Sequence, residues 1–354
     1  MGQMSKKSVR VRDIVIGGGA PVSIQSMTNV DTRDEEALLS QIQRLSGAGC
    51  DIVRVAIPDE DAAASFAKVR KKTDVPLVAD IHFDYKLALR AIDAGADKIR
   101  INPGNIGSAE KVREVVNAAK SAGIPIRVGV NSGSLEKDIL EKNGGVTAEG
   151  LCESALRNLR LIEDMGFDDL VVSLKSSDVK MNTAAYELVA KNTDHPIHVG
   201  VTEAGTLRRG KLKSAVGIGA LLLEGIGDTI RVSLTADPVE EVIFARQILE
   251  TVGLSEPAYD LISCPTCGRT AIDLQKYADL VDDRLRQGNY RKGIKVAVMG
   301  CAVNGPGEAR EADYGVAGGK GKGLIFAKGE IIKSVPEDKI VDELFALIDE
   351  REGR

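Results

Sequence analysis

The stretch KIRINPGNIGSAEKVREVVNAAKSAGIPIRVGVN, residues 98–131, contains a complete strand–helix–strand unit. Its two ends, Lys98–Ile101 and Ile126–Val130, are short runs rich in Ile and Val, which is typical of buried strands. The segment between them, Ser108–Gly123, begins with a helix-capping serine and an early acidic residue and ends with glycine. The unit is therefore predicted to form two parallel strands joined by a helix.

The same alternation occurs eight times before residue 251. The strands are predicted at Val22–Met27, Ile52–Ile57, Leu77–Ile81, Lys98–Ile101, Ile126–Val130, Leu170–Leu174, Ile197–Val201 and Thr229–Leu234. Eight strand–helix units in about 250 residues fit a TIM (β/α)8 barrel in number and in length. A doubly wound open sheet is the alternative, but it would not need eight units. Thr32 and the acids after it mark the start of the first helix, and Asp237 with Pro238 marks that of the last.

The composition changes after residue 251, which divides the chain into a barrel (1–251), a linker (252–263) and a small domain (264–354). The small domain is predicted to be α+β, with a strand at Lys295–Met299 and a final helix at Glu337–Arg351. Its Gly315–Gly323 segment is rich in Gly and Lys but lacks the G-x-x-x-x-G-K-[ST] pattern of a phosphate-binding loop. A hairpin turn is therefore expected there.

The composition excludes several classes of protein. The 354 residues carry a net charge of −5 and few aromatics, so a nucleic-acid surface is not expected. The longest apolar run, Ala215–Leu223, is too short to span a bilayer, and Met1–Asp13 lacks the apolar segment of a secretory signal. A cytoplasmic protein is expected, in which cysteines serve metal or redox chemistry rather than disulfides. Cys50 and Cys152 fall in the predicted barrel and are expected to pack as small apolar residues.

Charged residues occupy positions where a TIM barrel usually has apolar ones. Alternate residues of each strand point into the barrel and are mostly Val, Ile and Leu. On each of six strands, the polar residues occupy alternate positions. On each strand they therefore lie on one face. They are Arg54, then Arg100 and Asn102, then Arg127, Gly129 and Asn131, then Ser173 and Lys175, then His198, Gly200 and Thr202, and finally Arg231 and Ser233.

Five of these residues are cations, and only Asp80 and Glu203 are evident carboxylates at strand ends. One such cation could face the surface or pair with a buried acid. Five cations on five strands instead predict a positively charged mouth at the carboxyl end of the barrel strands. Because an isolated buried charge is very unfavourable, we expect an anionic ligand to pair with these cations. Arginine recognises phosphate oxygens through two parallel hydrogen bonds, so a diphosphate would meet this demand.

Lys175 and two of the histidines need separate consideration. Lys175 resembles the Schiff-base lysine of an aldolase, but a lysine held among phosphate groups would stay charged. His82, two residues after Asp80, either contacts the ligand or simply ends its strand. His195 precedes a proline in a predicted loop and is expected to be structural.

The small domain contains a C-x-x-C motif, formed by Cys264 and Cys267, and a third cysteine, Cys301, in a glycine-rich loop after a strand. A structural zinc site usually has four Cys or His ligands, and this domain has no histidine. Three thiolates favour an iron–sulfur cluster with one exchangeable iron over zinc or thioredoxin-like exchange. Glu308, seven residues after Cys301, is the nearest oxygen ligand.

At these motifs the chain resembles the family of bacterial 4-hydroxy-3-methylbut-2-enyl diphosphate synthases of the non-mevalonate isoprenoid pathway. The resemblance is carried by residues 264–270 (CPTCGRT) and 301–309 (CAVNGPGEA), and by 26–29 (SMTN), 100–105 (RINPGN), 128–134 (VGVNSGS) and 201–205 (VTEAG). It covers nearly the whole chain and indicates the short, two-domain form without an inserted third domain.

The resemblance implies a 4Fe–4S cluster held by Cys264, Cys267, Cys301 and Glu308. It implies reductive ring opening and dehydroxylation of 2-C-methyl-D-erythritol 2,4-cyclodiphosphate, with two electrons supplied singly by flavodoxin or ferredoxin. The residues expected to bind this substrate are Arg54, Asp80, His82, Arg100, Asn102, Arg127, Asn131, Lys175, Thr202, Arg231 and Ser233. Glu203 is expected to be the catalytic acid that protonates the departing oxygen.

A homodimer is expected from the path of the chain. The last barrel helix ends at the face opposite the mouth, and a linker of about 13 residues spans at most roughly 45 Å. A head-to-tail dimer, in which each cluster domain covers the partner's barrel, avoids a fully stretched linker. Two rival interpretations are a pterin-binding or aldolase-type barrel with a structural zinc domain, and a non-catalytic zinc- or iron-binding regulatory protein.

Overall fold

The structure is a computed structural model that describes residues 5–301 and 309–354. The chain divides into two compact units, with the boundary between Leu254 and Ser255, and each unit is described by itself. Within the described ranges, no helix combines the length and the apolar character needed to cross a bilayer.

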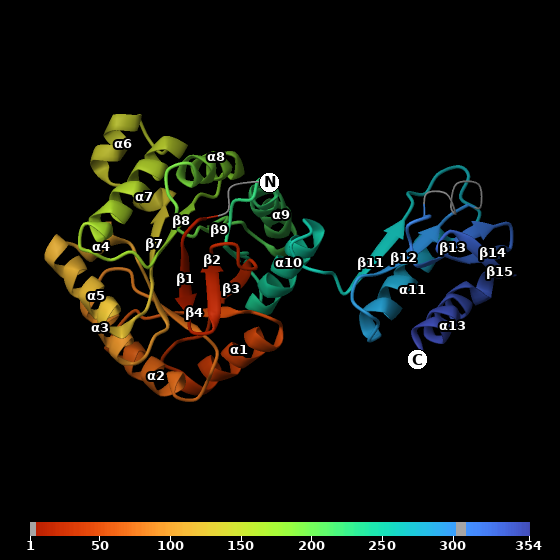
Figure 1. Cartoon of the computed structure of the whole chain (residues 1–354), viewed down its shortest axis with the longest axis horizontal. Helices are drawn as coiled ribbons and strands as arrows, with labels where there is room; N and C mark the ends of the chain where they lie inside the picture. The colour runs from red at the N-terminus through yellow and green to blue at the C-terminus, as the bar shows by residue number, and fades with distance from the viewer. Residues whose placement is uncertain (1–4, 302–308) are drawn as a thin grey trace. The chain divides into compact units, whose positions relative to one another are not determined.

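The first unit is an eight-stranded parallel barrel (Figure 1). Its strands are β3 (Ser23–Met27), β4 (Ile52–Ala56), β5 (Leu77–Asp80), β6 (Lys98–Ile101), β7 (Ile126–Asn131), β8 (Leu170–Lys175), β9 (His198–Gly200) and β10 (Thr229–Arg231). Strands adjacent in the chain are paired, β10 pairs with β3, and a bridge between Val172 and Ile197 joins β8 to β9. The predicted TIM barrel is confirmed.

Helices alternate with these strands. They are α1 (Glu35–Gly47), α2 (Glu60–Arg70), α3 (Tyr85–Asp93), α4 (Pro103–Ile106), α5 (Ala109–Ala122), α6 (Lys137–Asn143), α7 (Ala148–Glu163), α8 (Val179–Ala190), α9 (Leu207–Leu223) and α10 (Pro238–Thr251), with a short 3-10 turn η1 (Ser132–Ser134). The predicted start of α10 is confirmed, because the Asp237 side chain accepts a hydrogen bond from the Val239 amide. The cap of α1 is Asp34 rather than the expected Thr32, whose hydroxyl donates to the Ala56 carbonyl.

The strand ends agree with the predictions to within one residue, except at β10. That strand was predicted to reach Leu234 but ends at Arg231. The reason lies in α10, where the Glu241 carboxylate accepts a hydrogen bond from the Leu234 amide at 2.9 Å. The Leu234 amide thus donates its hydrogen bond to a side chain instead of to the backbone of a neighbouring strand.

An antiparallel hairpin of β1 (Ser8–Val11) and β2 (Ile14–Gly17) precedes the barrel and was not predicted. Its buried residues pack against inward-facing residues near the starts of three barrel strands. The contact joins Val9, Val11 and Ile16 to Ile52, Val78 and Val171. The hairpin therefore closes the end of the barrel opposite the mouth.

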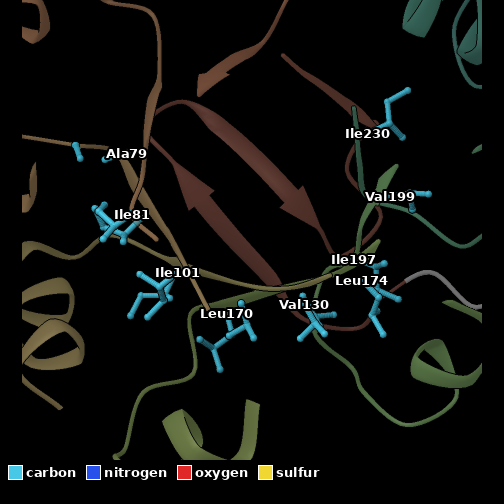
Figure 2. Packing of buried hydrophobic residues seen from close by; sticks show 14 of the residues in the cluster. Ala79, Ile81, Ile101, Val130, Leu170, Leu174, Ile197, Val199 and Ile230 are labelled. Atoms are coloured by element: carbon cyan, nitrogen blue, oxygen red, sulfur yellow. The ribbon is translucent and has the colours of Figure 1, made fainter. Parts of the chain in front are cut away.

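Apolar residues of the outward-facing parity fill the space between the strands and the helices. Figure 2 labels nine of them, Ala79, Ile81, Ile101, Val130, Leu170, Leu174, Ile197, Val199 and Ile230. Because the main apolar core lies outside the ring of strands, the positions inside the ring near the mouth are left to the polar residues of the other parity.

The second unit contains a five-stranded mixed sheet in the order β11-β12-β13-β14-β15. Its elements are β11 (Tyr259–Ser263), α11 (Leu274–Gln287), β12 (Ile294–Met299), β13 (Tyr314–Gly319), β14 (Lys322–Ala327), β15 (Glu330–Pro336), the 3-10 turn η2 (Glu337–Lys339) and α13 (Ile340–Glu352). The hairpin expected within Gly315–Gly323 is confirmed, since β13 and β14 pair in antiparallel register up to Gly319 and Lys322.

The linker is shorter than the predicted range 252–263. Residues 259–263 form β11, which pairs in parallel with β12. This edge strand is only half-buried, so its composition resembles that of a connecting segment. The stretch between α10 and β11 is therefore 252–258.

Candidate active site and metal centre

Inward-facing residues at the carboxyl ends of the barrel strands line a pocket of about 90 Å³. Its lining residues are Arg54, Asp80, His82, Arg100, Arg127, Asn131, Ser173, Lys175, Thr202, Arg231 and Ser233. Neighbouring strands are in register here, with Arg100 beside Asp80 on one side and Arg127 on the other. The structure thus brings together every expected substrate-binding residue except Asn102, and it adds Ser173.

Asp80 is the carboxylate shared by the cations of this pocket. Its Oδ1 atom accepts a hydrogen bond from Arg100 at 3.2 Å, and its Oδ2 atom lies 3.8 Å from Arg54 Nε and 3.4 Å from His82 Nε2. Burial alone would raise the pKa of Asp80, but Arg54, the hydrogen bond from His82 and Arg100 together hold that pKa far below its usual value. His82 therefore lines the pocket and also contacts its central carboxylate, Asp80.

Glu241 is a second buried carboxylate beside the pocket, which the sequence analysis missed. Its Oε2 atom lies 3.6 Å from Arg231 Nε and accepts a hydrogen bond from the Ser26 hydroxyl at 2.9 Å. Glu241 lies in the first turn of α10, and helices of a TIM barrel begin beside the mouth. An acid in that first turn is the signal that could have identified it.

Two glycines leave room for the cations. A Cβ atom added at Gly129 would lie 2.6 Å from Arg100 Nε. A Cβ atom at Gly200 would lie 2.7 Å from the Arg231 carbonyl oxygen and 3.2 Å from Lys175 Nζ. These two positions therefore require glycine for the side chains beside them to reach the mouth.

Arg127 and Lys175 are the cations without a buried acid of their own. Arg127 is 1% exposed, and its Nε and Nη1 atoms have no hydrogen-bond partner within the described part of the chain. Burial lowers the pKa of Lys175 well below its usual value, and the neighbouring Arg231 and Arg127 act in the same direction. The pocket thus holds more positive charge than its own carboxylates neutralise.

A second layer of polar residues lies deeper in the barrel, and the sequence analysis named only His198 among them. Gln25, Lys98 and His198 are each at most 1% exposed, and Lys98 Nζ and both ring nitrogens of His198 have no partner among residues 5–301 and 309–354. Burial, followed by the charge of Arg127, lowers the pKa of both Lys98 and His198 well below the usual values. Strand parity was the available signal, because Lys98 shares the face of Arg100.

Asn102 and Glu203 lie outside the lining of the pocket. The Asn102 side chain is buried and accepts a hydrogen bond from the Gly104 amide at 3.2 Å, which caps α4. Glu203 is exposed on the loop between β9 and α9. Its φ angle of 50° is one that residues other than glycine adopt rarely, and such strain is often found at functional loops.

The second unit brings two candidate cysteines to one edge of its sheet. Cys264 directly follows β11 and Cys301 follows β12, and these strands are parallel neighbours. The Gly300 amide donates a hydrogen bond to Cys264 Sγ at 3.2 Å, which places Cys264 beside the residue that precedes Cys301. Cys267 is exposed, and its amide donates to the Thr270 hydroxyl at 3.0 Å.

The chemistry of these thiols suits metal binding. A hydrogen bond from the Arg269 amide lowers the pKa of the Cys267 thiol, which favours the thiolate that a metal requires. Glu308, the expected fourth ligand, lies outside the described residues. By contrast, burial raises the pKa of Cys50 to about 12, and Cys152 is also buried, as expected for packing residues.

Within the described ranges, Glu163, Asp168 and His195 form another group that could hold a metal ion. Their potential metal-ligand atoms lie within 4.8 Å of one another. His195 Nε2 lies 2.8 Å from Glu163 Oε1, and the Lys7 ammonium lies 2.6 Å from Asp168 Oδ1. Because Lys7 already neutralises Asp168, the group is an ion-pair network near the closed end of the barrel. The expected structural role of His195 agrees with this arrangement.

Comparison with protein families matches both units. Residues 6–246 match the GcpE TIM-barrel domain and residues 260–350 match the GcpE protein C-terminal domain. A relative from Clostridium acetobutylicum is 58% identical over 99% of both chains, and one from Bacillus subtilis is 57% identical over 97% of this chain and 90% of its own. Both relatives are named 4-hydroxy-3-methylbut-2-en-1-yl diphosphate synthase (flavodoxin).

Two solved structures each match about 70% of this chain. A type I 3-dehydroquinate dehydratase from Clostridium difficile covers 70% of this chain and 97% of its own, with a TM-score of 0.51 and 13% identity. A dihydropteroate synthase from Yersinia pestis covers 71% of this chain and 100% of its own, with a TM-score of 0.49 and 17% identity. At 13% identity, the likeness to the dehydratase bears only on the fold.

Proposed function

The chain belongs to the GcpE family, and from this premise we propose how its own residues carry out the reaction that its relatives' names state. It is a flavodoxin-dependent oxidoreductase of isoprenoid precursor biosynthesis that forms 4-hydroxy-3-methylbut-2-en-1-yl diphosphate. The rival interpretations, a pterin-binding or aldolase-type barrel and a non-catalytic metal protein, are not favoured by relatives of this identity and coverage.

The barrel pocket binds the diphosphate of 2-C-methyl-D-erythritol 2,4-cyclodiphosphate. The observation that supports this most strongly is the excess of cations, since Arg127 and Lys175 are buried in the pocket without an acid of their own. Diphosphate oxygens would accept from the guanidinium groups and replace the missing counter-charge. Asn131 and Thr202, which line the same pocket, then orient the carbon skeleton.

A 4Fe–4S cluster fits the donor set of the second unit better than zinc does. Cys264 and Cys301 lie at one sheet edge, Cys267 is an exposed thiol of lowered pKa, and the unit contains no histidine. We assign Glu308 as the fourth ligand from the family resemblance. When bound, such a cluster passes single electrons from flavodoxin, or from ferredoxin, to the substrate.

The reaction needs two electrons and one proton for each substrate, since the phosphate oxygen that ring opening frees leaves as an anion. One C–O bond of the cyclic diphosphate breaks, a carbon–carbon double bond forms, and one hydroxyl leaves as water. The leaving hydroxyl needs a proton, and Glu203 on the loop after β9 is proposed as its donor.

Glu203→Gln tests this role. We expect the variant to keep its iron content and its affinity for the substrate but to lose turnover, whereas the exposed Glu149→Gln serves as control. Unchanged turnover in Glu203→Gln would remove Glu203 from the mechanism.

The proposal includes a head-to-tail homodimer. Because α10 ends opposite the mouth, the seven residues 252–258 would have to return along a helix of about 21 Å, and they span at most about 25 Å. Almost no length would remain for reaching the pocket of the same chain. We therefore propose that each cluster domain serves the barrel of the partner subunit.

The exposed face of α9 supports a dimer of barrels. Leu212, Val216 and Leu223 are 69%, 55% and 70% exposed and, at 100° per residue, lie within about 40° of one another around the helix. An antiparallel pairing centred on Val216 would place Arg209, seven residues before it, beside Glu224 of the partner subunit, eight residues after it. Val216→Asp should convert the dimer to monomer in light scattering.

Mixing two inactive variants tests the exchange of domains. Glu203→Gln and Cys264→Ser each damage one half of the site, so a mixture should recover part of the activity through heterodimers with one intact pair. Absence of any recovery would show that each chain closes on itself.

The proposal also places the protein in the cytoplasm. The five cysteines are free, and Cys267 is exposed. Exposed thiols persist in a reducing compartment.

A further inference from the structure

The edge of the second sheet that carries Cys264 and Cys301, which we call the cysteine edge, also carries the tip of a hairpin. β13 runs parallel to β12, so the last residue of β13, Gly319, lies at the edge where β12 ends. Lys320 then begins a tight turn, and Lys322 begins β14 opposite Gly319. The tip of the β13–β14 hairpin is therefore a neighbour of the cysteines.

The hairpin is packed closely against the segment that leads to Cys301. A Cβ atom added at Gly318 would lie 2.7 Å from Ile272 Cγ1 and 2.8 Å from the carbonyl oxygen of Gly300, the residue before Cys301. Only glycine permits this approach. Gly321 in the turn has a φ angle of 67°, which is in the left-handed region that favours glycine. These two glycines hold the hairpin tip beside the cysteine edge.

Three exposed cations flank the cysteines, and we call them the basic edge. They are Arg269, two residues after Cys267, and Lys320 and Lys322 at the hairpin tip. Within the described ranges none of the three forms an ion pair, whereas several other cations of the unit do. Those paired cations are Arg284, Arg286, Arg291 and Lys333. The charges of the basic edge are therefore available to a partner.

The cysteine edge as a whole carries more positive than negative charge. Besides the basic edge it includes the start of α11 and η2, because the Ala271 amide donates to the Gly300 carbonyl and the Glu337 amide donates to the Gly321 carbonyl. These segments add the cations Lys276 and Lys339 and the acids Asp273, Glu337 and Asp338. Five cations thus accompany three acids among the described residues of this edge, although residues 255–354 contain 15 basic and 17 acidic residues in all.

An electron donor has to approach the cysteine edge, because electron transfer between two proteins becomes slow when their redox centres are far apart. The names of the relatives specify flavodoxin. Flavodoxin carries flavin mononucleotide, whose phosphate group is anionic. Opposite charges on two protein surfaces speed their encounter and orient the complex. A cationic surface beside the cluster cysteines therefore complements such a donor.

We propose that the basic edge, formed by Arg269, Lys320 and Lys322, is the docking surface for flavodoxin on this chain. This inference rests on the proposed function, in which flavodoxin is the electron donor. In each encounter the reduced flavin loses one electron and the cluster gains it, so two encounters supply the two electrons of one turnover. The three cations hold the anionic surface around the flavin against the cysteine edge.

Binding of oxidised flavodoxin to the full chain purified without oxygen, measured by calorimetric titration, tests the proposal. The double variant Lys320→Glu/Lys322→Glu reverses two exposed charges and should weaken binding about tenfold or more. Added salt should weaken binding of the wild type more than that of the variant, because salt screens exposed charges. The matched control is Lys292→Glu/Lys328→Glu, which reverses two exposed lysines at the opposite edge of the same sheet and should bind like the wild type.

Turnover with two kinds of reductant separates docking from later steps. The variant Lys320→Glu/Lys322→Glu should be slow with reduced flavodoxin but keep wild-type turnover with dithionite and methyl viologen, which need no docking surface. Equal flavodoxin affinities of variant and wild type would overturn the inference. An equal loss of turnover with both reductants would also overturn it, because the lysines would then serve another step. A wild type that neither binds flavodoxin nor accepts its electrons would overturn the proposed flavodoxin dependence instead.

Discussion

Replacing Asp80 by asparagine probes the electrostatic balance of the barrel mouth. The substitution keeps the shape of the side chain but removes the charge that faces Arg54 and Arg100, whose side chains are 11% and 7% exposed. Removing one partner of a buried ion pair destabilises a protein by about 3–5 kcal/mol. At roughly 2–4 °C per kcal/mol for a unit of this size, the barrel should melt about 6–20 °C lower.

Circular dichroism melts measure this effect in the full chain, with Asp31→Asn as the control. Asp31 also pairs with an arginine, Arg33, but both side chains are more than half exposed, so its loss should shift the melting temperature by little. Pyrophosphate should stabilise Asp80→Asn more than it stabilises the wild type, because it supplies the missing negative charge and no longer meets a carboxylate. A variant that melts within about 2 °C of the wild type would refute the assignment of Asp80 as the central counter-charge.

Three further predictions concern the same pocket. Gly129→Ala should weaken pyrophosphate binding by tenfold or more, because its Cβ atom would lie 2.6 Å from Arg100 Nε, whereas Gly47→Ala, with open space around it, should not; equal affinities would contradict the packing argument. Proton uptake on pyrophosphate binding, measured as the difference in calorimetric enthalpy between HEPES and Tris at one pH, should be larger for the wild type than for Lys175→Met, because burial and neighbouring arginines lower the pKa of Lys175 in the free pocket and the anion raises it again; equal values for the two proteins would contradict this. The pKa of Asp80 is lowered on folding, so its contribution to stability is present above about pH 4 and is lost as the pH falls further; urea titrations should show a steeper loss below pH 4 for the wild type than for Asp80→Asn.

Strand parity was sufficient to predict most of the pocket. Arg100 and Arg127 lie on neighbouring parallel strands in register, so a period of two residues along each strand already implies that they meet. The same rule failed at Asn102, because the chain leaves β6 at that point and the side chain caps α4 instead. Parity says nothing about a residue once its strand has ended.

The features that the sequence did not reveal depend mostly on packing between elements that are far apart in the chain. Glu241 reaches Arg231 from a helix, and no periodicity within a strand predicts a partner from another element. The β1–β2 hairpin was missed because no helix separates its two strands, so it lies outside the alternation of strands and helices that marks the barrel, yet it closes the barrel. Lys98 was overlooked because it is the first residue of β6, and the polar positions considered there were those from Arg100 towards the carboxyl end of the strand.

Metal analysis of the full chain purified without oxygen tests the central claim most directly. The account predicts about four iron and four sulfide ions per chain with little zinc, and their loss in Cys264→Ser but not in Cys152→Ser. A wild-type chain that holds only zinc at Cys264, Cys267 and Cys301 would contradict it.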